Sequence, residues 1–163
     1  MKKSEYSFSF DEYDSIDELK DEDSSLLKEA RNATENAYAP YSHFNVGAVA
    51  RMVNGKIVSG SNQENASFPV GLCAERVLLA AASSLYPNLP LDTIAISYHN
   101  NNNEGKNDHP IAPCGICRQA LQEFEQRSGH MIRLILGGME GKVFVLSTAS
   151  SLLPMAFTKD ELE

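Results

Sequence analysis

The three cysteines of this 163-residue chain stand in two short strings, and their spacing restricts how the chain can fold. The strings are residues 73–75 (Cys-Ala-Glu) and 113–117 (Pro-Cys-Gly-Ile-Cys), so that Cys114 follows Cys73 by 41 residues. Three thiols are too few to pair completely as disulfides. Three is, however, the number of protein ligands that a catalytic zinc takes when its fourth position is kept for water. The sequence therefore predicts a fold that brings two distant segments together around one metal ion.

Both strings are placed to open helices. Cys114 and Cys117 are three positions apart, so they lie side by side on one face of a helix, and Pro113 ahead of them places both thiols in the first turn. The helix dipole favours the thiolate there, and the thiolate is the species that binds metal. Cys73 likewise opens an Ala- and Leu-rich segment, residues 73–85, that is typical of a buried helix.

Glu75 has the position of a proton carrier beside the metal rather than that of a ligand. Residues i and i+2 point about 200° apart on a regular helix. Cys73 and Glu75 therefore serve one small site only if Cys73 stands at the irregular start of its helix. The carboxylate then approaches from a different side than the sulfur and lies close to a water on the metal, where it can exchange protons.

Two features of this site stay open from the residues alone. Three thiolates leave Zn²⁺ with a net negative charge, and Arg76 is the candidate to offset it, the alternative being a surface arginine. A closed structural zinc with three cysteines and His109, five residues before Cys114, is the alternative to a catalytic site. The C-x-E spacing and the single cysteine of the first string favour the catalytic interpretation.

The rest of the sequence predicts one layered α/β domain of about five strands. Asn54-Gly55 between two strand-like runs is a strong hairpin signal. Pro40 and Gly129 mark the ends of helical segments. We expect helices over residues 25–38, 73–85 and 114–127, strands over 44–53, 56–60, 92–98, 131–136 and 142–146, and a polar loop over 99–111.

The acidic charge is concentrated at the amino terminus. The formal net charge is −8, and residues 1–25 hold nine acids against three lysines, which leaves −2 for the remainder. We predict that residues 1–24 form a weakly ordered acidic extension and that residues 25–163 form a single domain. Because a chain without a basic stripe is poorly suited to a phosphate backbone, we expect a small neutral substrate and no nucleic-acid partner.

Neither a membrane segment nor an export signal is expected. No stretch approaches the run of about 20 apolar residues that spans a bilayer. Residues 1–5 lead into acidic sequence rather than into an apolar signal region. We therefore expect a cytoplasmic protein in a reducing compartment, where clustered cysteines indicate a metal or catalysis rather than a disulfide framework.

From about residue 25 to its end, the chain resembles the small, three-cysteine, homotetrameric cytidine deaminases of the cytidine/deoxycytidylate deaminase family. The resemblance rests on five strings, whose order and spacing together are highly specific. They are residues 40–48 (Pro-Tyr-Ser-His-Phe-Asn-Val-Gly-Ala), 62–69 (Asn-Gln-Glu-Asn-Ala-Ser-Phe-Pro), 73–76 (Cys-Ala-Glu-Arg), 113–119 (Pro-Cys-Gly-Ile-Cys-Arg-Gln) and 152–157 (Leu-Leu-Pro-Met-Ala-Phe). The resemblance implies a three-layer α/β/α sandwich around a mixed sheet.

The resemblance also implies roles at the metal. One zinc ion per chain is expected to be held by Cys73, Cys114 and Cys117. Glu75 is expected to be the proton shuttle and Arg76 to hydrogen-bond the zinc thiolates.

For the substrate, the resemblance implies contacts from six further residues. They are Phe44, Asn62, Glu64, Phe68, Ala74 and Phe157. Asn62 and Glu64 are expected to hydrogen-bond the ribose 3′-hydroxyl, and Phe44 to pack against the pyrimidine. Phe68 and Phe157 are expected to be lent between neighbouring subunits of a homotetramer with shared active sites. Turn capping by the two polar residues and ordinary core packing by the phenylalanines are the alternatives.

The implied activity is hydrolytic deamination of cytidine, and of deoxycytidine, to uridine or deoxyuridine and ammonia in pyrimidine salvage. The resemblance implies that Glu75 would shuttle protons while zinc-bound hydroxide attacks C4, and that the chain would be a hydrolase acting on C–N bonds of cyclic amidines. Alternatives are deamination of another amino-heterocycle, such as a nucleoside antibiotic or a free base, and nucleic-acid editing. A zinc-stabilised binding protein with a closed site is the alternative outside the enzymes.

Overall fold

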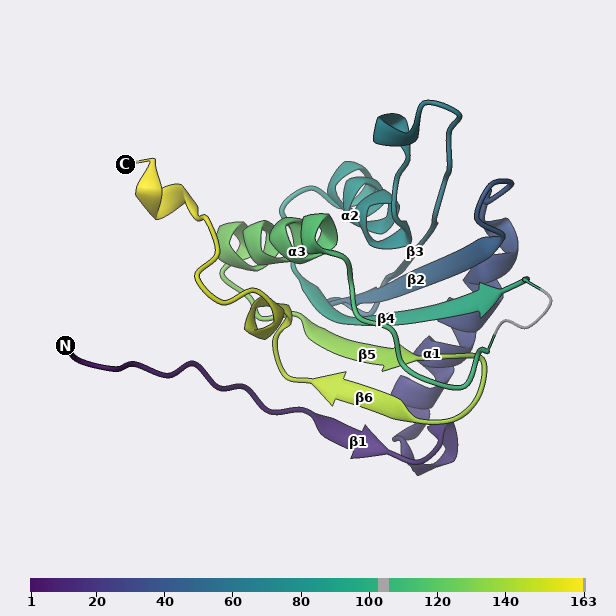
Figure 1. Cartoon of the computed structure of the whole chain (residues 1–163), viewed down its shortest axis with the longest axis horizontal. Coiled ribbons are helices and arrows are strands. Elements are labelled where there is room, and N and C mark those ends of the chain that lie inside the picture. The colour runs from purple at the N-terminus through teal and green to yellow at the C-terminus, as the bar shows by residue number, and fades with distance from the viewer. Residues whose placement is uncertain (103–105, 163) are drawn as a thin grey trace.

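The computed structural model describes residues 1–102 and 106–162, and its centre is a mixed sheet of six strands (Figure 1). The strands are β1 (Asp11–Tyr13), β2 (Phe44–Met52), β3 (Ile57–Ser61), β4 (Leu91–Asn100), β5 (Arg133–Gly137) and β6 (Val143–Leu146). The α-helices are α1 (Asp21–Ala33), α2 (Ala74–Leu85) and α3 (Gly115–Ser128). The strand order is β1-β6-β5-β4-β2-β3. β4 and β5 run parallel, and the other neighbouring strands run antiparallel.

Helices cover both faces of this sheet. On one face, α1 buries Leu27 against a cluster that includes Ile135 of β5. On the other face, α2 and α3 bury Leu78 and Leu121 in a larger cluster around Ile94 of β4. The three-layer α/β/α sandwich around a mixed sheet is therefore confirmed, with six strands where about five were expected.

The expected helices and strands all occur, with some changed ends. β4 continues two residues beyond the expected end at residue 98, because His99 and Asn100 pair with Asn45 and Phe44 of β2. The polar loop expected over residues 99–111 therefore starts after Asn100. Residues 103–105 of that loop lie outside the described residues.

Helix α1 lies nearer the amino terminus than the segment 25–38 expected for it. It begins at Asp21, and its first turn carries three acids, which the positive end of the helix dipole stabilises. Asp23 is buried, and its carboxylate accepts two hydrogen bonds of 2.7 Å from the Arg133 guanidinium of β5. This long-range ion pair holds the helix start to the sheet, and no local sequence pattern contains it.

The acidic extension supplies the sixth strand. Residues 11–13 pair antiparallel with β6 at the edge of the sheet. The ring of Phe10 lies 4.7 Å from the ring of Phe144 in β6, centroid to centroid. The hydroxyl of Tyr6 donates a 3.0 Å hydrogen bond to the carbonyl of Ser151. Aromatic contacts therefore supplement the few backbone bonds of a three-residue edge strand.

The predicted boundary between residues 24 and 25 falls inside α1. Within residues 11–24 lie β1, a 3-10 turn and the start of α1, so this part of the extension supplies an edge strand and the beginning of the helix that covers one face of the sheet. The division into a weakly ordered extension and a domain stays a prediction. Among the helices of the described residues, none has the length and apolar content needed to cross a bilayer.

Helix α2 lies directly on β3 at Gly60. A Cβ atom at Gly60 would come 2.5 Å from the backbone nitrogen of Leu78 and 2.6 Å from the carbonyl oxygen of Ala74. Only a residue without a side chain allows this approach. The first turn of α2, which carries Glu75, is therefore held at a fixed height above the sheet.

Candidate active site and metal centre

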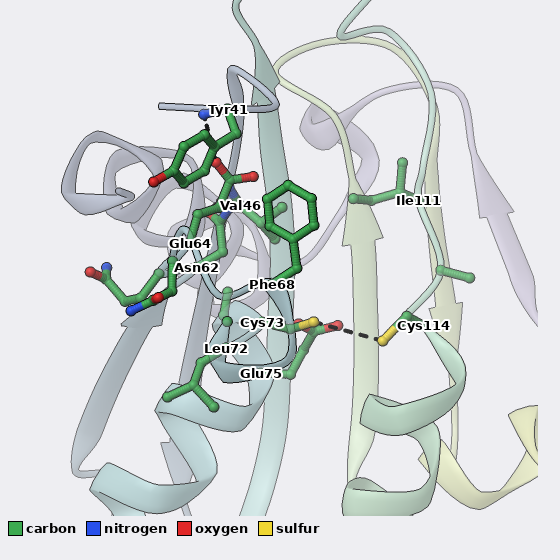
Figure 2. A pocket seen from close by; sticks show the side chains of 15 residues that line it. Tyr41, Val46, Asn62, Glu64, Phe68, Leu72, Cys73, Glu75, Ile111 and Cys114 are labelled. Atoms are coloured by element: carbon green, nitrogen blue, oxygen red, sulfur yellow. Dashed lines mark hydrogen bonds between the residues drawn. The ribbon is translucent and has the colours of Figure 1, made fainter. Parts of the chain in front are cut away.

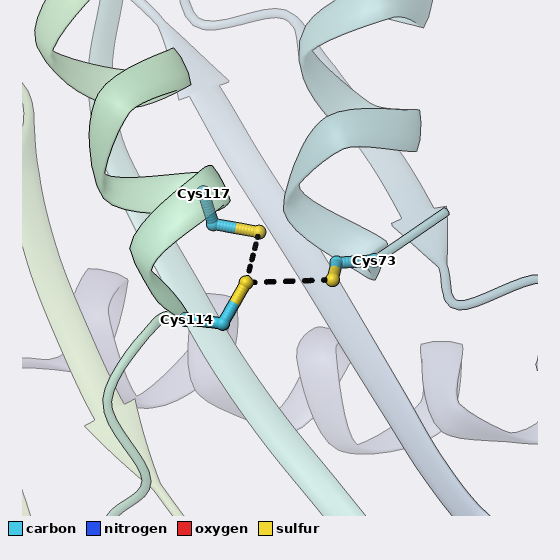
Figure 3. Close-up of side chains that lie close together, drawn as sticks. All are labelled: Cys73, Cys114 and Cys117. Atoms are coloured by element: carbon cyan, nitrogen blue, oxygen red, sulfur yellow. Dashed lines mark hydrogen bonds between the residues drawn. The ribbon is translucent and has the colours of Figure 1, made fainter. Parts of the chain in front are cut away.

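Two helix starts bring the three cysteines together on one face of the sheet (Figure 3). Cys73 immediately precedes α2 and Cys114 immediately precedes α3, both with extended backbone (ψ 154° and 167°). Cys117 follows in the first turn of α3. Because α2 leads into β4 and α3 follows it, both helices begin near the carboxyl end of β4. The helix dipoles there favour the thiolate forms.

The sulfur atoms are spaced as a tetrahedral zinc site requires. Cys114 Sγ lies 3.7 Å from Cys73 Sγ and 3.5 Å from Cys117 Sγ. All three sulfurs lie within 4.8 Å of one another. Zn–S bonds of about 2.3 Å at tetrahedral angles separate sulfurs by about 3.8 Å. The three thiols therefore fit a zinc ion that keeps one coordination position free.

His109, the alternative fourth ligand of a closed site, points elsewhere. Its ring nitrogen Nδ1 lies 3.1 Å from the hydroxyl of Tyr98 and 3.1 Å from a carboxylate oxygen of Asp108. Over the described ranges 1–102 and 106–162, the group of potential metal ligands around the sulfurs contains the three cysteines alone. The geometry thus favours the open site over the closed Cys₃His site.

Glu75 lies in the first turn of α2 and is 4% exposed. Since Cys73 stands before the helix with extended backbone, its sulfur and the Glu75 carboxylate reach the same site from different sides, as their i, i+2 spacing requires. Figure 2 shows Glu75 beside Cys73, facing Cys114. Burial raises the pKa of Glu75 and so moves it toward neutral pH. A group that transfers protons works best when its pKa lies near the working pH.

The cysteine thiols hold their protons unequally. A hydrogen bond from Cys117 lowers the pKa of Cys73 to about 6, and the positive charge of Arg76 contributes a smaller lowering. The same contact with Cys73, together with burial, raises the pKa of Cys117. Among the residues with described positions, the Arg76 side chain makes no hydrogen bond to a sulfur. The expected bond from Arg76 to the thiolates stays a prediction.

A cavity of about 410 Å³ opens above the sulfurs, between α2, β2 and the loop that precedes α3 (Figure 2). This volume is in the range of small-molecule sites. The predicted site residues that line it are Asn62, Glu64, Phe68, Cys73, Ala74, Glu75 and Cys114. Cys117 is buried outside the lining. One cavity thus joins the sulfurs and the buried carboxylate to both polar residues expected at the ribose.

Asn62 is hydrogen-bonded at both ends of its amide. Its Oδ1 accepts a 2.7 Å bond from the N–H of Val46, and its Nδ2 donates a 2.9 Å bond to the carbonyl of Phe44. The side chain thereby ties the end of β3 to β2. An amide has two N–H donors, so one donor of Asn62 remains for a ligand in the cavity.

Glu64 accepts hydrogen bonds from the chain that leads into β2. Its Oε2 lies 2.9 Å from the backbone nitrogen of Tyr41 and 3.3 Å from that of Ser42. Hydrogen bonding to the Ser42 hydroxyl and to these two N–H groups lowers the pKa of Glu64. Capping is therefore part of the role of Glu64, and its Oε1 atom remains as an acceptor for a ligand.

The three predicted phenylalanines are placed differently from one another. Phe68 lines the cavity and is 75% exposed. Phe44 stacks on Tyr98 with ring centroids 5.0 Å apart and is not among the lining residues. Val46, two residues along β2, supplies that wall instead. Phe157 lies outside this cavity and is 60% exposed.

Several lining residues were missed by sequence reasoning. They include Tyr41, Val46, Leu72 and Ile111. Val46 lay within the string 40–48, where the alternation of a strand puts it on the same face as Phe44. Ile111 lies in a loop whose path is set by tertiary contacts, so no local signal marked it.

A three-layer α/β/α domain with a three-sulfur site at two helix starts and a buried glutamate beside it has the features of the zinc-dependent deaminases. Residues 20–131 match the cytidine and deoxycytidylate deaminase zinc-binding region. The chain belongs to this family.

Known cytidine deaminases are similar to this chain over most of their length. The chain is 38% identical over 137 residues to a cytidine deaminase of Halalkalibacterium halodurans, covering 84% of this chain and 95% of that protein. It is 34% identical to a cytidine deaminase of Sporosarcina psychrophila, covering 84% and 92%. The crystal structure of a cytidine deaminase from Burkholderia pseudomallei superposes with a TM-score of 0.70 at 38% identity, covering 82% of this chain and 97% of that one.

Proposed function

We propose that this chain is a hydrolytic, zinc-dependent cytidine deaminase of pyrimidine salvage, which converts cytidine or deoxycytidine to uridine or deoxyuridine and ammonia. The observation that carries the proposal is Glu75, buried beside three sulfurs at an open cavity of about 410 Å³. Relatives named cytidine deaminase, at 38% and 34% identity, support the choice of substrate. The enzyme is thus a hydrolase that acts on the C–N bond of a cyclic amidine.

One zinc ion per chain would be held by Cys73, Cys114 and Cys117. When bound, zinc supplies a water whose pKa is lowered enough for attack near neutral pH. Two of the sulfurs stand at helix starts, which stabilises their thiolate forms. Arg76 offsets part of the negative charge of three thiolates.

Glu75 moves two protons in the proposed reaction. Its carboxylate takes the first from the attacking water and delivers it to N3 of the pyrimidine, which makes C4 electrophilic. The water oxygen then bonds to C4. Glu75 takes the second proton from the new hydroxyl group on C4 and carries it to the amine. The C4–N4 bond then breaks, ammonia leaves, and C4 keeps its oxygen as the carbonyl of the product. Cytidine and one water are thereby converted to uridine and ammonia.

The polar wall of the cavity would hold the ribose. The free N–H of Asn62 donates to the 3′-hydroxyl, and Oε1 of Glu64 accepts from it. Since the lowered pKa keeps Glu64 ionised, it stays an acceptor in mildly acidic solution. Ala74 borders the base, and Phe44 supports the wall from behind. Both ribose and deoxyribose carry the 3′-hydroxyl, so both nucleosides are accepted.

The exposed aromatic residues support a homotetramer with shared sites. Phe68 and Phe157 are 75% and 60% exposed, and Ile116 on α3 is 64% exposed. Gln119 of α3 donates a 2.8 Å hydrogen bond to the carbonyl of Phe157, which holds that residue away from its own cavity. Neighbouring subunits would bury these side chains and lend Phe68 and Phe157 to each other. Light scattering coupled to size exclusion tests the assembly.

We place the enzyme in the cytoplasm and give it no nucleic-acid or membrane partner. Three unpaired cysteines suit a reducing compartment. The acidic charge of −8 disfavours a phosphate backbone, which leaves the free nucleoside as substrate.

The test is uridine formation by the purified, zinc-loaded chain, with deoxycytidine, free cytosine and deoxycytidylate assayed in parallel. We expect turnover of both nucleosides and much weaker turnover of the base and the nucleotide. Absence of nucleoside turnover at one zinc per chain would overturn the proposal. X-ray absorption would then separate the two remaining alternatives. An oxygen as the fourth zinc ligand would indicate an open site that acts on another amino-heterocycle, whereas a fourth ligand from the protein would indicate a closed structural site.

A further inference from the structure

Tyr98 is one of the largest fully buried side chains, and it lies directly behind the cavity. It is 1% exposed and stands opposite Val46, a cavity residue, in the register of β4 against β2. Directly opposed residues of an antiparallel pair share a face of the sheet. The ring of Phe44 stacks on Tyr98 at 5.0 Å with an angle of 13° between the planes. Tyr98 therefore packs against Phe44 and stands opposite Val46, which lines the cavity.

The hydroxyl of Tyr98 has its hydrogen-bond partner on the loop before α3. Its oxygen lies 3.1 Å from Nδ1 of His109, and the two rings meet edge to face at 5.7 Å. Throughout the described part of the chain, His109 is the one side chain within hydrogen-bond distance of this hydroxyl. A buried phenol loses stability without a partner, so Tyr98 favours the docked position of His109.

The loop around His109 is docked by further contacts. The side chain of Asn107 accepts a 2.6 Å bond from the N–H of Asn100, and its carbonyl accepts a 3.1 Å bond from the N–H of Glu140. A Cβ atom at Gly138 would lie 2.1 Å from the carbonyl oxygen of Asn107. The loop can lie this close to the β5–β6 turn because residue 138 has no side chain.

The docked loop ends in the far wall of the cavity. Ile111 and Ala112 line it, and Figure 2 shows Ile111 across the cavity from Glu64 and Asn62. Pro110 stands between His109 and Ile111 and restricts the backbone. An anchor at His109 therefore fixes where Ile111 stands.

We propose that Tyr98, acting through His109, is a positioning residue that sets the distance between the Val46 wall and the Ile111 wall and so determines how tightly the nucleoside is held. The inference rests on the proposed deaminase function for its kinetic consequence. The structural part of the inference, that Tyr98 anchors residues 107–112, does not depend on which substrate the protein uses. Tyr98 does not touch the reacting atoms and is not assigned a chemical step.

The kinetic test compares Tyr98→Phe with the zinc-loaded wild type. Loss of one net hydrogen bond predicts a KM for cytidine raised about 3- to 10-fold, with kcat within about twofold and zinc content unchanged. His109→Phe should give the same pattern. The KM of the double variant should be no higher than that of the more impaired single variant, because both substitutions remove the same hydrogen bond between Tyr98 and His109. His109→Asn, which keeps a polar atom near the place of Nδ1, should recover most of the affinity. Tyr86→Phe, a hydroxyl deletion at the end of α2, is the matched control and should leave KM unchanged.

Hydrogen exchange gives the second readout. Tyr98→Phe and His109→Phe should speed exchange in the peptides that carry the Asn100 and Glu140 amides, which are bonded to Asn107. Tyr86→Phe should not. Unchanged exchange in both loop variants overturns the inference even if KM rises. Additive effects in the double variant, or a fall in kcat at constant KM, also overturn it. If wild type fails to deaminate any nucleoside, the proposed function fails, whereas exchange still decides whether Tyr98 anchors the loop.

Discussion

The buried carboxylate of Glu125 in α3 accepts a hydrogen bond of 2.6 Å from the N–H of Ile132, just before β5. The same carboxylate accepts bonds of 3.0 Å from the N–H groups of Ala149 and Ser150, and one of 2.9 Å from the Thr148 hydroxyl. One side chain thus joins α3 to the loop before β5 and caps the short 3-10 helix after β6. Removing it would leave three backbone donors without a partner.

We predict that Glu125→Ala lowers the free energy of unfolding by about 2–5 kcal/mol, because buried N–H groups lose their acceptor. Urea denaturation followed by circular dichroism measures the change. Glu123→Ala, two residues away on the exposed side of the same helix, is the control and should stay within about 0.5 kcal/mol of wild type. Equal effects of the two substitutions would refute this account.

Removal of zinc by a chelator should abolish deamination and lower the melting temperature while leaving most of the secondary structure. The two apolar clusters of the sheet do not depend on the sulfurs, so the α/β/α layers persist. A ligand that binds only the folded chain stabilises it in proportion to the logarithm of its concentration. Activity and melting temperature should both return when zinc is added. Global unfolding on chelation would instead indicate a structural metal.

Glu75→Gln should reduce kcat by a factor of about 10²–10⁴ or more, because the amide cannot shuttle protons. Zinc content by mass spectrometry should remain that of wild type, since the carboxylate is not a proposed ligand. Glu64→Gln is the matched comparison at the proposed ribose contact and should act mainly on KM. Loss of zinc from the Glu75 variant would contradict the assignment.

Asn62→Ala should cost both stability and affinity. It leaves the Val46 N–H and the Phe44 carbonyl without their partner, which we expect to lower the free energy of unfolding by about 1–3 kcal/mol. The KM for cytidine should rise more than kcat falls, because the proposed contact with the ribose is lost. Asn101→Ala, at an exposed position, is the control for both measurements. A destabilised variant with normal KM would restrict Asn62 to a capping role.

Phe10→Ala tests whether the acidic extension is part of the folded domain. The ring packs on Phe144 at 4.7 Å and is 45% exposed, so its loss should lower the free energy of unfolding by about 1 kcal/mol. Phe8→Ala, whose ring lies 6.4 Å from that of Phe10, should have a smaller effect. Turnover should be unchanged in both. If neither substitution alters stability, the extension is weakly ordered in solution, as its composition predicts.

Prediction from sequence worked best where the signal was local. The two cysteine strings predicted the starts of α2 and α3 to within one residue. The signals were local: a cysteine at the start of each helical segment and, for α3, a proline just before the cysteine. Prediction worked less well where a distant contact decided the outcome. Helix α1 starts at Asp21 rather than at residue 25, and Asp23 in its first turn is bound by Arg133, 110 residues away. Likewise, β1 forms because β6 offers an open edge.

By itself, the sequence determined the donor atoms, the positions of the helices that present them and the alternation of each strand, because these depend on residue type and short-range geometry. Only the tertiary structure decided which side chains line the cavity. Phe44 stacks on Tyr98 while Val46 and Ile111 form the walls, since the stacking and the loop path arise from contacts between β2, β4 and residues 107–111. Those contacts join segments up to about 60 residues apart, and no local pattern encodes their mutual packing.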